Sequence, residues 1–92
     1  MNVQESAETL ALEALAWLAG QDGLLPAFLA ASGLEAGQIA SAAAQPEFLA
    51  GVLDFLLQDD AWVMGFCEAR GLPYTAPAQA RAALPGGAIA WD

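Results

Sequence analysis

The chain has 92 residues, which is enough for one domain and a single hydrophobic core. With 58% hydrophobic and 14% charged residues, we expect apolar surface to be left over once that core is filled, and a partner or a second copy is its natural cover. The net charge of −9, from 11 carboxylates against two arginines, argues against nucleic-acid binding and against docking on anionic membranes.

The acidic composition has two interpretations. One is solubility and mutual repulsion between copies, and the other is docking on a basic partner or mimicry of a polyanion. The segment from Met1 to Glu8 lacks the basic flank and apolar run of a signal peptide, and no uncharged apolar run approaches the roughly 20 residues of a membrane span. We therefore expect a cytoplasmic protein with no membrane partner.

The first half of the chain predicts two helices and a weak third. Asn2 and Glu5 have the spacing of a capping box, which predicts a mostly buried helix from there to about Ala19, with Gly20 as its stop. Asp22 is the expected cap of a second helix that ends at residues 32–34, where Gly33 takes a left-handed conformation. Residues 35–44 predict a short, weaker helix.

Three more helices are predicted in the second half. Pro46 begins a helix to about Gln58 whose two adjacent apolar stripes make it the expected central helix. Asp59 and Asp60 open the next helix, which ends at residues 71–72. Thr75 is the expected cap of a last helix over residues 76–84, and residues 85–92 form a short apolar tail.

The two halves share a pattern at an offset of 38 residues. Residues 22–34 read DxLLxxFxxAxGL, and residues 60–72 read DxWVxxFxxAxGL. Such self-similarity favours a helical unit written twice, over roughly 10–44 and 48–82, although two amphipathic hairpins built by the same rules would also produce it. We predict a single all-α domain over residues 1–92, a compact bundle of five or six short helices with two related hairpin halves as one possibility.

The side chains for common catalytic mechanisms are missing. The chain has no histidine and no lysine, so its serines and threonines lack a base, and the lone Cys67 lies in an apolar stretch typical of a core position. We predict neither an enzyme nor a cofactor. The remaining chemical candidates are the carboxylates of Asp54, Asp59 and Asp60, which are close in sequence and can supply oxygen ligands to a divalent cation.

Three residues near the C-terminus are candidates for an interface. Trp91 and Ile89 lie in the apolar tail, which can either fold back onto the core or present these two residues to another molecule. Tryptophan is common at the centre of protein interfaces. Arg81 has no acidic residue near it in sequence, so it is available either to the central helix or to a carboxylate of a partner. Trp17 and Trp62 lie on apolar helix faces, and we expect them in the core.

The chain resembles a family of short, acidic, all-helical bacterial proteins of unknown function. The stretches that carry the resemblance are ALEALAWL at 11–18, FLAGVLDFLLQDD at 48–60, GLP at 71–73 and ARAALPGG at 80–87. The resemblance implies an all-helical fold over nearly the whole chain but brings no activity, cofactor or catalytic residue.

Together these observations predict a non-enzymatic protein-interaction module that self-associates or docks on a protein partner. The alternative is a small ligand-binding or divalent-metal-binding domain that uses the carboxylates near the junction of the fourth and fifth predicted helices.

Overall fold

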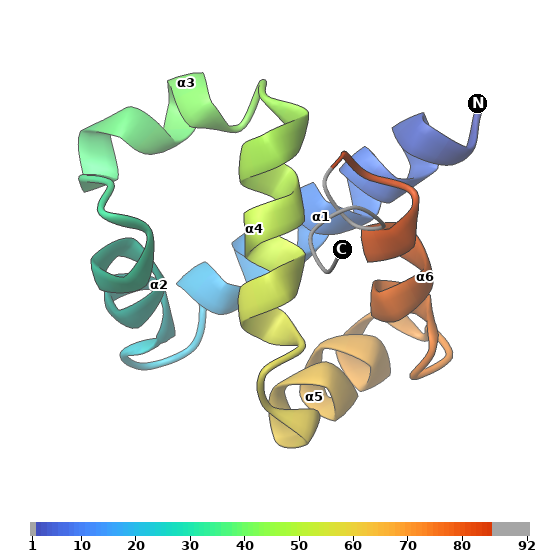
Figure 1. The fold of residues 1–92 in the computed structure, drawn as a ribbon. Helices are drawn as coiled ribbons and strands as arrows, with labels where there is room; N and C mark the ends of the chain where they lie inside the picture. Colours follow the sequence, from blue (N-terminus) through green and yellow to red (C-terminus); the bar gives the residue numbers. More distant parts are fainter. Residues whose placement is uncertain (1, 86–92) are drawn as a thin grey trace.

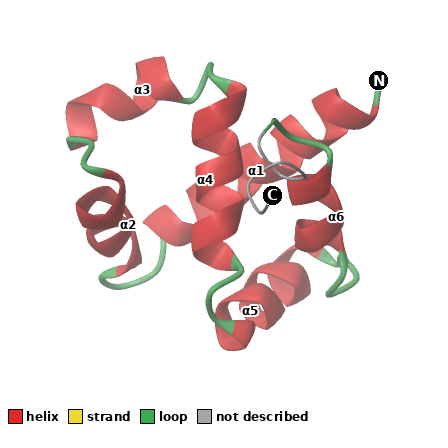
Figure 2. Cartoon of the chain, viewed as in Figure 1, coloured by secondary structure: helices red, strands yellow, loops and turns green. Residues whose placement is uncertain are grey.

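The computed structural model describes residues 2–85, and within them the backbone forms six α-helices, one 3₁₀ helix and no strand (Figures 1 and 2). The predicted all-α fold of five or six short helices is therefore confirmed. In chain order the elements are α1 (Val3–Ala19), α2 (Leu24–Ser32), the 3₁₀ helix η1 (Ala36–Gln38), α3 (Ile39–Ala42), α4 (Pro46–Leu56), α5 (Asp60–Arg70) and α6 (Ala76–Ala82).

Helix α4 is the centre of the fold, as its two apolar stripes predict. It packs against α1, which crosses behind it in Figure 1, and against α2 and α6 on either side. Only one seam of α4 is left for polar residues, because adjacent stripes at helical spacing bury most of its circumference. Its buried residues are Leu49, Ala50, Val52, Leu53, Phe55 and Leu56.

Helix α1 is less buried than its sequence predicts. It buries one stripe, Ala7, Ala11, Ala14, Leu15 and Leu18, while Leu12 on another face is 43% exposed. The alanines let α4 and α6 approach α1 closely on that stripe, while Leu10 and Trp17 beside it are partly buried against the core. The expectation that most of this helix is buried was wrong, since its neighbours leave residues such as Thr9, Leu12 and Ala16 exposed.

The predicted starts of three helices have different outcomes. At α1 the capping box is present, with the Glu5 amide donating to Asn2 Oδ1 at 2.7 Å and the Asn2 amide to Glu5 Oε1 at 3.2 Å. Asp22 was a wrong prediction, because a left-handed Gly23 with φ 76° occupies the cap of α2 and no side chain bonds there. Thr75 occupies the cap of α6, but its helical backbone angles leave its side chain without a capping bond.

The stops of α2 and α5 are alike, as the repeated pattern predicts. Gly33 and Gly71 both take left-handed backbone angles, with φ 78° and 68°, and each donates its amide to the last turn of its helix. The beginnings differ, because α5 is capped by Asp59 whereas α2 has no side-chain cap. The helices that follow them differ too: α6, which comes after α5, packs against α1 and α4, whereas α3, which comes after α2 and η1, contacts chiefly η1. A true duplication therefore stays a prediction.

Helix α5 is held to the core by aromatic contacts. The Trp17 ring meets Phe66 edge-on at 6.2 Å between ring centroids, and Trp62 stacks on Phe55 at 5.0 Å. Both tryptophans are partly buried and pack against the core, as expected. Cys67 is fully buried in the same helix, and its burial raises the pKa of the thiol, which disfavours the nucleophilic thiolate.

Within residues 2–85 no helix is long and apolar enough to cross a membrane by itself. Only α1 and α2 taken together reach the required length and composition, and the chain bends by 120° between them. Both helices give residues to the core, among them Leu18 and Phe28.

Candidate functional site

A groove of about 760 Å³ lies between α2, the η1–α3 segment and α4. Its lining combines aromatic and small apolar residues with amides, hydroxyls and two carboxylates. The residues are Phe28, Ala31, Ser32, Leu34, Gly37, Gln38, Ser41, Ala42, Gln45, Glu47, Phe48, Gly51, Asp54, Phe55 and Gln58.

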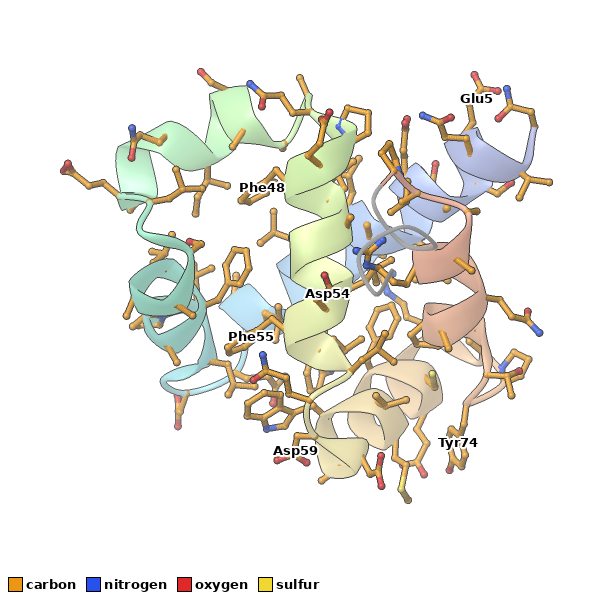
Figure 3. All side chains as sticks on the ribbon, viewed as in Figure 1. Glu5, Phe48, Asp54, Phe55, Asp59 and Tyr74 are labelled. Atoms are coloured by element: carbon orange, nitrogen blue, oxygen red, sulfur yellow. The ribbon has the colours of Figure 1, made fainter. Side chains whose placement is uncertain are left out.

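Three phenylalanines form the floor of the groove. Phe28 of α2 meets both Phe48 and Phe55 of α4 edge-on, with ring centroids 5.6 and 5.4 Å apart. Phe48 and Phe55 are separated by seven residues, so helical pitch brings them to one face of α4, on the side toward α2 and α3 in Figure 3. Phe28 and Phe55 are 3% and 7% exposed, so this floor is an extension of the core.

Gly51 lies on the groove side of α4, between the two phenylalanines of that helix. Apart from the backbone of its own helix, a Cβ atom placed there would meet no atom of residues 2–85 within 4 Å, so close packing does not require the glycine. Glycine inside a helix costs roughly 0.5–1 kcal/mol relative to alanine. The result is a notch in the middle of the groove wall, which the sequence interpretation missed.

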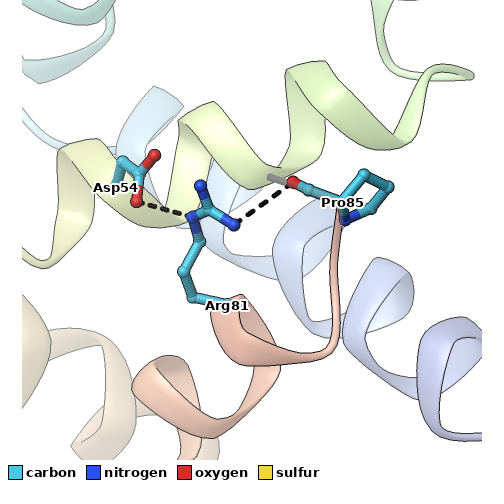
Figure 4. A network of polar contacts seen from close by, with 3 residues as sticks. All are labelled: Asp54, Arg81 and Pro85. Atoms are coloured by element: carbon cyan, nitrogen blue, oxygen red, sulfur yellow. Dashed lines mark hydrogen bonds and ion pairs between the residues drawn. The ribbon is translucent and has the colours of Figure 1, made fainter. Parts of the chain in front are cut away.

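Within the described part of the chain, the charged residues that line the groove are Glu47 and Asp54, and no basic residue lines it. Asp54 Oδ1 accepts a hydrogen bond from Arg81 Nε at 2.6 Å, and Arg81 Nη1 also donates to the Pro85 carbonyl at 3.3 Å (Figure 4). Arg81 therefore contacts the central helix, one of the two alternatives open from sequence. With its side chain 16% exposed, its guanidinium is used within the chain.

The three aspartates singled out from sequence are not brought together into one site. Asp59 accepts the Ala61 amide at 2.8 Å as the cap of α5, and Asp60 is an exposed first residue of that helix. Asp54 lies within α4, before the turn that leads to α5, and Figure 3 shows it apart from Asp59. Nowhere in residues 2–85 do three His, Cys, Asp or Glu side chains gather so as to hold a metal ion.

The remaining candidates are two residues of the C-terminal tail and a second hollow beside α1. Ile89 and Trp91 lie outside the described residues. A second hollow of about 310 Å³ lies between the start of α1 and α6, and among residues 2–85 no aromatic or charged side chain lines it. Its residues are Asn2, Val3, Ser6, Ala7, Leu10, Ala76, Gln79, Ala80 and Ala83. The aromatic, acidic groove is therefore the richer of these two sites in binding chemistry.

Tyr74, the only tyrosine of the chain, provides a spectroscopic probe of the turn after α5. Its hydroxyl donates to Glu68 Oε2 at 2.6 Å, and this hydrogen bond, followed by burial and the Glu68 charge, raises the pKa of Tyr74. We expect the tyrosinate absorbance to appear above the ordinary pKa of about 10. Glu68→Ala should return the midpoint toward that value, while Glu8→Ala on α1 should leave it unchanged.

The raised pKa of Tyr74 also makes the stability of the fold depend on pH. Because the pKa of Tyr74 is higher in the folded chain, its contribution to stability is complete below the ordinary tyrosine pKa and is lost as the pH rises through the folded value. Coincident titrations of wild type and Glu68→Ala would show that this hydrogen bond does not form in solution.

Comparison with known proteins identifies a family but no activity. A protein-family model described as "Protein of unknown function (DUF3572)" matches residues 4–87. No curated protein and no solved structure matches the chain. The resemblance noted from sequence is thereby confirmed, and any function has to be argued from the groove.

Proposed function

Because the chain belongs to the DUF3572 family of proteins of unknown function, we propose its role from the groove: it is a non-enzymatic interaction module that binds an amphipathic, basic helix of another protein. The observation that carries this proposal is an aromatic floor beside two carboxylates in a groove that no basic side chain lines. We take the protein to act in the cytoplasm, as its sequence predicts.

The shape and lining of the groove favour a segment of protein as its ligand. Two helices and a short helical segment surround it, as in grooves that accept the apolar face of a partner helix. Protein interfaces place aromatic residues in a desolvated centre with polar groups around them. Phe28, Phe48 and Phe55 supply that centre here, and amides and hydroxyls such as those of Gln45 and Ser41 supply the polar surroundings.

Charge favours a basic partner over a second copy of the chain. Each copy has a net charge of −9, so two copies repel one another, and their grooves are acidic alike. A basic helix gains from the same field, which raises its rate of association and disfavours acidic competitors. Of the two modes predicted from sequence, we therefore propose docking on a protein partner.

Isotope-labelled protein titrated with helical peptides tests this function. The probes are three amphipathic peptides of about 15 residues that share one leucine face and differ only in net charge: basic, neutral or acidic. With the basic peptide, we expect the largest amide shifts at groove residues such as Gly37 and Gly51. The neutral peptide should bind more weakly, and the acidic one should produce no shifts.

A substitution that fills the notch tests whether the peptide binds there, and the same substitution outside the groove is its matched control. Gly51→Leu places its side chain in the groove, where nothing lies within 4 Å of the new Cβ, so the fold should tolerate it. We expect this variant to bind the basic peptide at least about tenfold more weakly, the equivalent of roughly 1.4 kcal/mol. Ala16→Leu adds leucine at an exposed position of α1 outside the groove and should change nothing. Binding that survives Gly51→Leu, or shifts centred away from the groove, would contradict the proposal.

A further inference from the structure

We infer that the helix bound in this groove carries two basic residues seven positions apart, beside an apolar side chain that seats over Gly51. This inference rests on the proposed function and adds the register of the partner. It follows from how α4 arranges its charges, its phenylalanines and its glycine.

Two parallel rows run along the groove side of α4. Glu47 and Asp54 are seven residues apart and so lie on one side of the helix, about 10.5 Å apart along its axis. Phe48 and Phe55 form a second row with the same spacing, one residue further round. A partner helix alongside α4 has the same rise per residue. Two of its basic groups therefore match the two carboxylates best when they too are seven residues apart, whichever direction the partner helix runs.

Along α4, the notch at Gly51 lies between Glu47 and Asp54 and also between Phe48 and Phe55. It is four residues after Glu47 and three before Asp54, so the two carboxylates flank it along the helix axis. In helix packing a side chain of one helix inserts into a hole between four residues of the other. A glycine with no atom near its Cβ position deepens such a hole, which here is bounded by Phe48 and Phe55.

Both carboxylates have an oxygen available to a donor from outside. Glu47 is exposed and forms no ion pair within residues 2–85. Asp54 bonds Arg81 through Oδ1, and no hydrogen bond among those residues uses its Oδ2, while its side chain is 56% exposed. A carboxylate accepts several hydrogen bonds at once, so Asp54 can hold Arg81 and a partner's cation together.

A second copy of this chain does not have the required pattern. Its two basic residues, Arg70 and Arg81, are 11 positions apart, and Arg81 is already bonded to Asp54. The partner is therefore a different, basic protein.

Peptides that differ only in the spacing of their charges test the register. Each is an alanine-based helix of about 15 residues with a leucine stripe and two lysines, labelled for fluorescence anisotropy. In one the lysines are seven positions apart beside the stripe. In its isomer they are nine apart, which turns the second lysine to the opposite face. Both are prepared with the lysine row on either side of the leucine row, since the partner helix can run in either direction.

We expect the seven-spaced peptide to bind about three- to fivefold more tightly than its isomer, as for one surface ion pair, with the difference lost at high salt. Glu47→Gln should reduce that preference. If both isomers bind equally and Gly51→Leu weakens both, the register is wrong while the proposed function stands. If neither binds, or Gly51→Leu has no effect, the proposed function fails and the register with it.

Discussion

Replacing Phe66 with alanine is expected to lower the free energy of unfolding by about 3–5 kcal/mol, a large share of the roughly 5–15 kcal/mol of a domain this size. Phe66 is fully buried on α5, and its ring meets the edge of Trp17 at 6.2 Å between centroids. The substitution removes the buried ring and leaves a cavity, and it takes away the aromatic contact of Trp17. Besides Phe66, the buried residues of α5 are Val63 and Cys67, and both are smaller.

Urea unfolding followed by tryptophan fluorescence and circular dichroism measures the effect. Phe66→Leu, which keeps most of the buried volume, should lose less than about 1.5 kcal/mol. Phe48→Ala is a second control, because Phe48 is only partly buried at the groove and should cost less than Phe66→Ala. A loss below about 1 kcal/mol for Phe66→Ala would mean that α5 does not pack on the core through this ring.

The second large effect is a difference in sign between two glycines replaced by alanine. At Gly65 of α5 a Cβ would lie 2.9 Å from Cζ2 of Trp17, closer than carbon atoms approach. Overpacking of this kind costs about 1–3 kcal/mol, and better helix formation returns about 0.5–1 kcal/mol. At Gly51 of α4 a Cβ meets nothing within 4 Å, so only the helical gain remains.

We therefore expect Gly65→Ala to destabilise the fold by up to about 2.5 kcal/mol, the overpacking cost less the helical gain, and Gly51→Ala to stabilise it by about 0.5–1 kcal/mol. For a domain this small, each kcal/mol shifts the melting temperature by roughly 4–8 °C, so thermal unfolding resolves the two variants. Trp17→Leu is the test of cause, since a smaller side chain should make Gly65→Ala tolerable. If both glycine variants shift the melting temperature in the same direction, the Trp17 ring does not lie over Gly65.

Most of the fold follows from local signals in the chain. The capping box at Asn2, proline at the start of α4 and the left-handed stops at Gly33 and Gly71 all act within a few residues, and each was predicted correctly. The errors at Asp22 and Thr75 are local too. A left-handed glycine at position 23 takes the cap of α2, and a helical conformation at Thr75 removes the geometry that its side chain needs.

The groove was beyond prediction because its parts come from segments far apart in the chain. Phe28 meets Phe48 and Phe55 only because α2 packs on α4, and Asp54 meets Arg81 across 27 positions. Gly51 gave one usable signal, a glycine inside an otherwise apolar helix that costs stability there. Grouping aspartates by nearness in sequence was misleading, because Asp54 bonds Arg81, Asp59 caps α5 and Asp60 is an exposed residue of the first turn of α5.

The amino-acid sequence by itself determined the helices, their stops, the acidity and the missing catalytic side chains. These depend on composition and on hydrogen bonds within a turn or two of helix. Only the tertiary structure decided which apolar faces meet, and it left α4 with an open aromatic side between α2 and α3. The reason is physical. The periodicity of apolar residues specifies that one face of a helix is buried, whereas which segment packs on that face depends on contacts that form only on folding.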